Sequence, residues 1–173
     1  MIEKFFPDMM FNSIYDIDLE QLKALGVSGL ILDIDNTLVR PDVKKPDETV
    51  HAWLDYLRES GFNICILSNS GRKRVTKFTS DLGVMSICHA GKPMRKGFLK
   101  ALRLMDLEPN QTCMIGDQIF TDVYGAKRIG IVAIYTKPIV FKEIFTVMLK
   151  RLPEKIVLHK YDKAKYDKAI RSE

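Results

Sequence analysis

The sequence predicts an α/β fold: a Rossmann-like three-layer sandwich built on a mainly parallel sheet of about five strands. Short apolar runs typical of buried strands alternate with longer segments in which apolar residues recur at helical spacing. Such alternation is typical of parallel sheets that are covered by helices on both faces. A length of 173 residues suits one domain, and no linker or repeat divides the chain. We therefore expect a single domain over residues 1–158 and a charged tail over 159–173.

Each expected element has a local justification in the sequence. Strands are assigned to short apolar runs that end in polar residues or glycine. The helix expected at 47–60 has Leu54 and Leu57 at helical spacing, and a glycine follows it. The expected strands lie at 29–35, 62–68, 84–90, 112–117 and 131–136, and the expected helices at 47–60, 71–83, 94–107 and 119–130.

The composition is that of a globular protein, since 46% of the residues are hydrophobic and 28% are charged. The chain does not begin with a basic segment followed by an apolar stretch, and no run reaches the roughly 18 apolar residues of a membrane span. Cys65, Cys88 and Cys113 lie in or beside apolar runs without the spacing of metal ligands, which favours reduced thiols. We expect a cytoplasmic protein.

The net charge of +5 is unevenly distributed along the chain. Residues 141–173 hold nine basic and five acidic side chains, so this end carries +4 and the rest of the chain is nearly neutral. Nucleic acid is therefore not the obvious partner of the body of the domain, and no nucleic-acid partner is expected.

Polar side chains follow the predicted strands where ligands bind in parallel sheets, at their carboxyl ends. The stretch "ILDIDNTL" ends a buried strand in two carboxylates, which cost desolvation energy unless a cation or hydrogen bonds compensate them. This edge of the sheet can bind a divalent cation and a phosphate group, because it gathers carboxylates, a hydroxyl, an amide and a lysine. These candidates are Asp33, Asp35 and Thr37 after the first strand, Ser68 and Asn69 after the second, Lys92 after the third, and Asp117 and Asp122 after the fourth.

These residue types can supply each group that a phosphoryl transfer requires. Mg²⁺ prefers oxygen ligands, and Asp33 and Asp117 can supply carboxylates from neighbouring strands. Attack by Asp33 on a phosphoryl group would form an aspartyl-phosphate. Asp35 can protonate the leaving alkoxide and later deprotonate the hydrolytic water. Lys92 would offset the negative charge, while hydroxyl groups such as that of Ser68 would hydrogen-bond the phosphate oxygens.

Four stretches in this order, "DIDNTL", "ILSNS", "GKP" and "GDQIFTD", resemble the motifs of the haloacid dehalogenase (HAD) superfamily phosphatases. The resemblance implies a magnesium ion held by Asp33, the backbone carbonyl of Asp35, and Asp117. It further implies that Asp122 supports the site by orienting Lys92 or a metal-bound water. The remaining implied roles are Asp33 as nucleophile, Asp35 as acid and base, Lys92 as charge neutraliser, and Thr37, Ser68 and Asn69 as phosphate ligands.

The spacing of these motifs leaves no room for a large cap domain. Only a loop, one helix and one strand fit between Asp35 and Ser68, and only a helix and a strand between Asn69 and Lys92. A site without a lid suits a large substrate, such as a protein, a nucleic-acid end, a polymer or a lipid headgroup. Alternatively, a second subunit acts as the lid, which would make the protein a homo-oligomer.

Two flanking segments bear on the substrate. The start of the chain is rich in aromatic and methionine residues, and residues 138–158 mix apolar with basic side chains. Such a segment can lie on an anionic membrane surface, although packing on the core with charges facing water explains it more simply. The whole layout resembles the capless HAD subclass IIIA, which includes phosphatidylglycerophosphate phosphatases. We therefore expect a Mg²⁺-dependent phosphomonoester hydrolase that acts on such a lipid, peripherally at the inner face of the membrane.

Other interpretations remain open at this point. The enzyme alternative is a phosphatase for a small soluble phosphate, such as phosphoglycolate or a sugar phosphate. A phospho-acceptor signalling module fits less well, because receiver domains carry the acceptor aspartate at the third strand, where this chain has Cys88 and His89. An inactive binding scaffold also fits less well, because no motif residue is missing. Some candidates also have simpler roles: Ser68, Asn69 and Asp117 as helix caps, Lys96 as a rival of Lys92, and Arg40, Arg72 and Lys73 as solvated charges rather than contacts of substrate anions.

Overall fold

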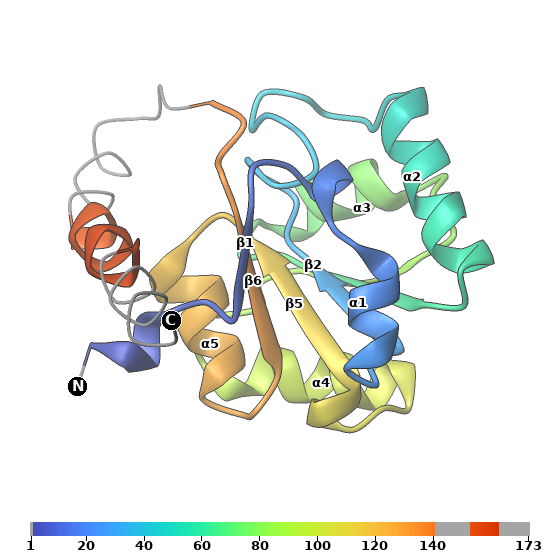
Figure 1. Ribbon diagram of the computed structural model, residues 1–173. Coiled ribbons are helices and arrows are strands. Elements are labelled where there is room, and N and C mark those ends of the chain that lie inside the picture. The colour runs from blue at the N-terminus through green and yellow to red at the C-terminus, as the bar shows by residue number, and fades with distance from the viewer. Residues whose placement is uncertain (1, 141–152, 163–173) are drawn as a thin grey trace.

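The computed structural model describes residues 2–140 and 153–162 of the chain. In this part of the chain six strands form one parallel sheet in the order β1-β6-β5-β2-β3-β4. The strands are β1 Met9–Phe11, β2 Gly29–Leu32, β3 Asn63–Leu67, β4 Met85–Ile87, β5 Thr112–Gly116 and β6 Val132–Thr136. This architecture, with helices on both faces of the sheet (Figure 1), confirms the predicted Rossmann-like sandwich.

Helices and short turns connect the strands. The α-helices are α1 Leu19–Ala24, α2 Glu48–Glu59, α3 Arg72–Thr79, α4 Arg95–Met105 and α5 Tyr124–Lys127, and residues 153–162 form one more helix. The 3₁₀ turns are η1 Glu3–Phe5, η2 Ile14–Asp16 and η3 Pro109–Gln111, and η4, Ile119–Val123, is a π-helical turn. No helix in the described ranges is both long and apolar enough to cross a membrane.

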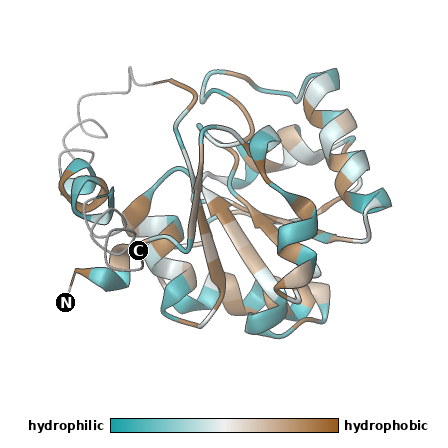
Figure 2. Ribbon diagram, in the orientation of Figure 1, coloured by the Kyte–Doolittle hydropathy of each residue, from teal (hydrophilic) through white to brown (hydrophobic). Residues whose placement is uncertain are grey.

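Two hydrophobic cores lie on the two faces of the sheet. One core contains side chains of α1, α2 and α3, such as Leu54 and Phe78, packed with every second residue of the central strands. The other contains side chains of α4, α5 and η4, such as Phe98. The strands are mostly hydrophobic, whereas hydrophilic residues gather on the outer helices and loops (Figure 2). Burial on both faces explains why the central strands read as continuous apolar runs.

Strand register brings the polar strand ends together. Leu32 of β2 lies opposite Ile66 of β3 and Ile115 of β5. The residues that follow these strands, Asp33, Ser68 and Asp117, therefore reach the same edge of the sheet.

Two parts of the fold differ from the expected elements. The strand β1 was not expected, because three half-buried residues after a proline show no strand periodicity. It extends the sheet by pairing with β6, where Met9 lies opposite Ile134. The continuous helix expected at 119–130 is instead the π-helical turn η4 followed by the single turn of α5. Turns of this kind are frequent at functional sites.

Candidate active site

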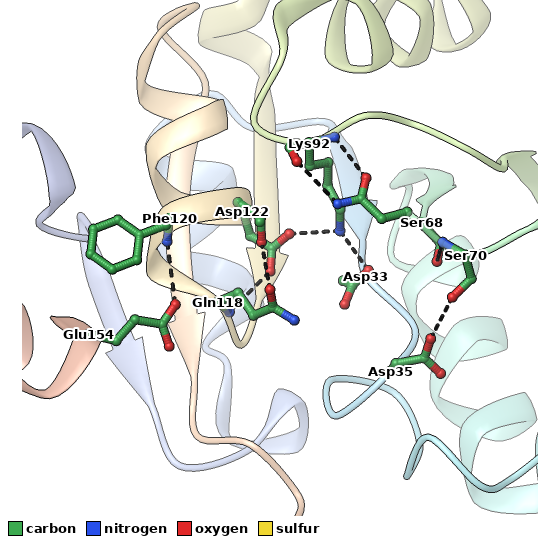
Figure 3. A network of polar contacts seen from close by, with 11 residues as sticks. Asp33, Asp35, Ser68, Ser70, Lys92, Gln118, Phe120, Asp122 and Glu154 are labelled. Atoms are coloured by element: carbon green, nitrogen blue, oxygen red, sulfur yellow. Dashed lines mark hydrogen bonds and ion pairs between the residues drawn. The ribbon is translucent and has the colours of Figure 1, made fainter. Parts of the chain in front are cut away.

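The lysine of the third motif lies between two carboxylates at the carboxyl edge of the sheet. Lys92 Nζ is 2.6 Å from Asp33 Oδ1 and 2.7 Å from Asp122 Oδ1 (Figure 3). All three side chains are buried. A buried ammonium between two carboxylates is strongly held, because each charge replaces the water that the others have lost.

Asn69 fixes the loop that carries this lysine. Its Oδ1 accepts a hydrogen bond from Lys92 N at 2.7 Å, and its Nδ2 donates to Lys92 O at 3.1 Å. The amide thus acts on the backbone of Lys92 and holds the lysine at its place between the strands. The predicted contact of Asn69 with phosphate remains a prediction.

Asp35 is held on the other side of Asp33 from Asp122 (Figure 3). Its Oδ2 accepts a hydrogen bond from Ser70 Oγ at 2.9 Å, and its Oδ1 lies 2.8 Å from Arg74 Nη2. The side chain of Asp35 is 28% exposed, whereas that of Asp33 is only 8% exposed. The two carboxylates of the "DID" stretch therefore differ in surroundings, which agrees with different roles in a reaction.

The loop after β5 directs Asp122 inward. Its Oδ2 accepts a hydrogen bond from Gln118 N at 3.1 Å, at the beginning of η4. A side chain at Gly116 would not fit, because a Cβ built there would lie 2.5 Å from Asp122 Cγ. The helix at 153–162 supports the same turn, since Phe120 N donates to Glu154 Oε1 at 3.5 Å. The structure thus places Asp122 against Lys92, while its predicted supporting role remains to be tested.

Three buried carboxylates form a candidate metal centre. One oxygen from each of Asp33, Asp117 and Asp122 lies within 4.8 Å of the others. The carboxylate of Asp35 is not part of this cluster; the sequence-based expectation assigns its backbone carbonyl as the ligand. One ammonium against three carboxylates leaves an excess of negative charge, and an all-oxygen donor set is what Mg²⁺ prefers. These residues therefore fit a divalent cation.

Titration of the central pair reflects this excess. Burial raises the pKa of Asp33 to about 6, and the negative charges of Asp122 and Asp35 add to the effect, while Lys92 opposes it. Burial alone would lower the pKa of Lys92, but the charges and hydrogen bonds of Asp122 and Asp33 outweigh it and raise the pKa. Lys92 therefore stays protonated, whereas the ionised form of Asp33 is destabilised in the absence of a metal.

An open cavity of about 240 Å³ connects Asp33, Asp35 and Lys92 to solvent. Thr37 does not line it; this residue lies in the wall of a second cavity of about 600 Å³, and its buried Oγ1 has no hydrogen-bond partner in the described part of the chain. The role of Thr37 as a phosphate ligand remains a prediction. The lining of the smaller cavity brings together five predicted residues with three others: Asp33, Asp35, Ser68, Asn69 and Lys92, with Ser70, Gln118 and Thr121.

Sequence reasoning missed two residues that contact Asp35, namely Ser70 and Arg74. Ser70 directly follows the predicted Ser68 and Asn69, and Arg74 lies in the first turn of α3. The sequence offered Arg72 and Lys73 as candidates from the same turn, but the structure shows Arg74 as the one that contacts the site. Helical spacing could have separated them, because Val75 and Phe78 point into the core and thereby fix which neighbours face the sheet edge.

Comparison with known proteins agrees with this geometry. Residues 5–130 match the family model of the haloacid dehalogenase-like hydrolases. The chain is 37% identical to a probable phosphatase, YqeG, of Bacillus subtilis over 159 residues, which are 91% of this chain and 92% of that protein. It is 26% identical to the chloroplastic phosphatidylglycerophosphate phosphatase 1 of Chlamydomonas reinhardtii over 84% of this chain, but it spans only 58% of that protein.

Among solved structures, an uncharacterized protein from Listeria monocytogenes serotype 4b has the same fold. The TM-score is 0.54 and the identity 19%, and the alignment covers 78% of this chain and 99% of the other. The family model matches most of the chain, and the described site agrees with it. This chain belongs to the haloacid dehalogenase-like hydrolases and is a phosphatase of that family.

Proposed function

We propose that this phosphatase is a Mg²⁺-dependent phosphomonoesterase that acts through an aspartyl-phosphate on a large or membrane-presented substrate, with phosphatidylglycerophosphate as the leading candidate. One observation carries the proposal: Asp33, Asp35, Ser68 and Lys92 line one open cavity, with the two carboxylates in different surroundings. A nucleophile, a proton carrier, a hydroxyl donor and a fixed cation are the groups that hydrolysis of a phosphomonoester requires.

Phosphoryl transfer begins at Asp33. Because Lys92 holds Oδ1, the other carboxylate oxygen is left to attack phosphorus: a bond from Asp33 to phosphorus forms, and the ester P–O bond breaks. Asp35 delivers a proton to the departing oxygen. Asp35 then takes a proton from the water that attacks the phosphoryl group, which releases phosphate and restores Asp33.

The surrounding residues hold the phosphoryl group during both steps. Ser68 and Lys92 both line the cavity. The Ser68 hydroxyl would donate to a phosphate oxygen, and Lys92 would offset the negative charge. Mg²⁺, bound by Asp33, Asp117 and the backbone carbonyl of Asp35, would supply further neutralisation of the phosphate and the carboxylates. Enzymes of this family use a divalent metal, and the cluster of buried carboxylates fits one.

Two observations support a large substrate. In the described ranges of the chain, helices and strands of the sandwich account for the segments between the motifs, so no cap domain is inserted there. A relative that matches most of this chain is named for phosphatidylglycerophosphate. A lipid of this kind would be met at the inner face of a membrane by a peripheral, cytoplasmic enzyme. Residues 141–152, the middle of the segment expected to contact it, lie outside the described residues.

The test is phosphate release by the full chain in the presence of Mg²⁺ or EDTA. We expect activity on p-nitrophenyl phosphate with Mg²⁺, and its loss in Asp33→Asn but not in Asp18→Asn, an exposed helix cap where asparagine serves equally well. Vesicles that contain phosphatidylglycerophosphate should be hydrolysed more efficiently than phosphoglycolate or sugar phosphates. A strong preference for a small soluble phosphate would overturn the lipid assignment, and full activity of Asp33→Asn would overturn the nucleophile.

A further inference from the structure

Arg74 is fixed beside the proton carrier of the proposed reaction. Its Nη2 lies 2.8 Å from Asp35 Oδ1, its Nη1 donates to Lys44 O at 3.4 Å, and its guanidinium carbon lies 5.2 Å from the centre of the Phe78 ring. These contacts leave most N–H groups of the guanidinium for another partner. The side chain is 20% exposed, so part of it reaches solvent, and Asp35, which it contacts, lines the cavity of the site.

Four more cations belong to the two segments that meet at Arg74. Arg72 and Lys73 precede it in the first turn of α3, and Lys44 and Lys45 belong to the loop whose backbone it contacts. All four are exposed, and in the described part of the chain none lies within ion-pair distance of a carboxylate. Asp42 in the same loop is already paired with Arg40. We call these five residues, Lys44, Lys45, Arg72, Lys73 and Arg74, the basic rim.

The charge of the rim exceeds what positioning of Asp35 requires. One carboxylate that is also bonded to Ser70 Oγ needs a single cation to orient it, and Arg74 supplies that. The exposed cations in the two segments that meet at Arg74 create a positive potential near Asp35, and such a field attracts anions. A guanidinium can bind a carboxylate and a phosphate oxygen at the same time, because its N–H groups point along different edges of one plane.

The leaving group of the substrate would lie on the side of the site where Arg74 lies. Asp35 protonates the departing oxygen in the proposed mechanism, so the rest of the substrate must pass Asp35. Figure 3 shows Asp35 and Ser70 away from the buried pair of Lys92 and Asp122. Since Arg74 contacts Asp35 directly, a group attached to the departing oxygen by a short chain is within reach of Arg74.

We propose that Arg74, with the basic rim around it, binds a second anionic group of the substrate: a phosphodiester joined to the hydrolysed phosphomonoester through a three-carbon linker. Such a linker separates the two ester oxygens by about 5 Å when extended. This distance suits an anion that bonds to the guanidinium beside Asp35. The inference rests on the proposed function and adds to it the feature by which the enzyme distinguishes its substrate from simple phosphomonoesters.

Two soluble substrates isolate this recognition from the membrane. Glycerol 3-phosphate and deacylated phosphatidylglycerophosphate share the same phosphorylated glycerol end, but only the second carries the phosphodiester. We expect the wild type to have at least about tenfold higher kcat/KM for the second compound, mainly through KM. Arg74→Gln should remove most of this preference, a loss of about tenfold. Arg74→Lys should retain part of it, because the positive charge remains although the two-pronged guanidinium is lost.

Control variants and assays on lipid vesicles test whether Arg74 binds the second anion or only positions Asp35. Lys77→Gln, one turn further along α3 and exposed, should leave the preference unchanged. Equal losses on both substrates in Arg74→Gln would mean that Arg74 only positions Asp35, which would overturn the inference. So would an effect seen only on vesicles to which anionic phosphatidylglycerol has been added, because the anion would then be a neighbouring lipid. A wild type that hydrolyses both soluble compounds equally refutes the inference alone, whereas a wild type without phosphatase activity refutes the proposed function as well.

Discussion

Replacing Asp33 by asparagine should stabilise the metal-free protein at neutral pH, although it removes the proposed nucleophile. The reason is the local charge. Asp33, Asp117 and Asp122 bring one oxygen each to within 4.8 Å of one another, and Lys92 is the cation between two of them. Asparagine resembles the protonated form of Asp33 in shape and can still accept a hydrogen bond from Lys92, so it removes a buried charge while it keeps the packing.

The pKa of Asp33 gives the magnitude. Burial raises this pKa from the ordinary value of 3.8 to about 6. A rise of about two units at about 1.36 kcal/mol per unit corresponds to about 3 kcal/mol that the ionised group costs the folded state at pH 7. Because the folded pKa lies above the unfolded one, the folded state binds the proton more tightly. The cost is therefore absent below about pH 4, grows between pH 4 and 6, and is complete above pH 6.

Thermal unfolding in EDTA measures this cost. For a domain of this size about 3 kcal/mol corresponds to a rise in Tm of about 6–12 °C, so Asp33→Asn should melt higher than wild type by that amount at pH 7. The difference should shrink to about a third of this at pH 4.5 and approach zero below pH 4. With Mg²⁺ in excess, wild type should gain stability and Asp33→Asn should gain less, because one metal ligand is lost.

Asp18→Asn is the matched control, since asparagine replaces aspartate at an exposed helix cap with little change in stability. The reasoning about the site is refuted if Asp33→Asn melts lower than wild type in EDTA at pH 7. It is equally refuted if the difference does not depend on pH.

Three further changes probe the lysine, the packing and the thiols. Lys92→Ala should lower kcat on p-nitrophenyl phosphate by at least about 10²-fold, because a preorganised cation beside the nucleophile is lost. Gly116→Ala should weaken Mg²⁺ binding, measured by calorimetry, and cost about 1–3 kcal/mol in urea unfolding, because its Cβ displaces Asp122. Burial raises the pKa of Cys65 to about 12 and also raises that of Cys113, so neither thiol should react with Ellman's reagent at pH 8 until the protein unfolds.

Each of these results has a control or a contradicting outcome. A Lys92→Ala enzyme with wild-type kcat would remove Lys92 from the proposed mechanism. Gly97→Ala serves beside Gly116→Ala, because its Cβ would lie 2.5 Å from Ala90 O, in a helix outside the carboxylate cluster. If both glycine variants weaken Mg²⁺ binding equally, the effect comes from general destabilisation rather than from Asp122. Reaction of two or more thiols in the native protein would contradict the burial of Cys65 and Cys113, since only Cys88 is partly exposed.

The central sheet and the strand-end residues could be predicted from the sequence because both depend on local patterns. Strands buried on both faces are uninterrupted apolar runs, and parallel pairing brings the residues after them to one edge whatever the details of packing. This is why Asp33, Ser68 and Lys92 were expected together and are found together at one cavity.

The contacts that orient these residues were beyond sequence reasoning. The edge strand β1 has only three residues and is stabilised by pairing with β6, a partner more than a hundred positions away. The π-helical turn depends on the inward side chain of Asp122 and on the space that Gly116 leaves. The attachment of Asn69 to the backbone of Lys92 requires the two loops to be in place, and no local pattern encodes that distance.

The site combines opposite charges at different depths. Its buried part has more carboxylates than cations, which makes the metal-free fold costly and metal binding favourable for the same physical reason. Beside Asp35, which lines the cavity, the two segments that meet at Arg74 hold more cations than carboxylates. Three carboxylates and one ammonium leave two negative charges in the buried part, which a bound divalent cation would cancel. A phosphomonoester would then meet no net repulsion there, whereas a second anion is attracted directly by the cations around Arg74. The metal would therefore act mainly on turnover and the basic rim mainly on the choice of substrate, and because exposed charges are screened by salt while buried ones are not, only the second contribution should weaken at high ionic strength.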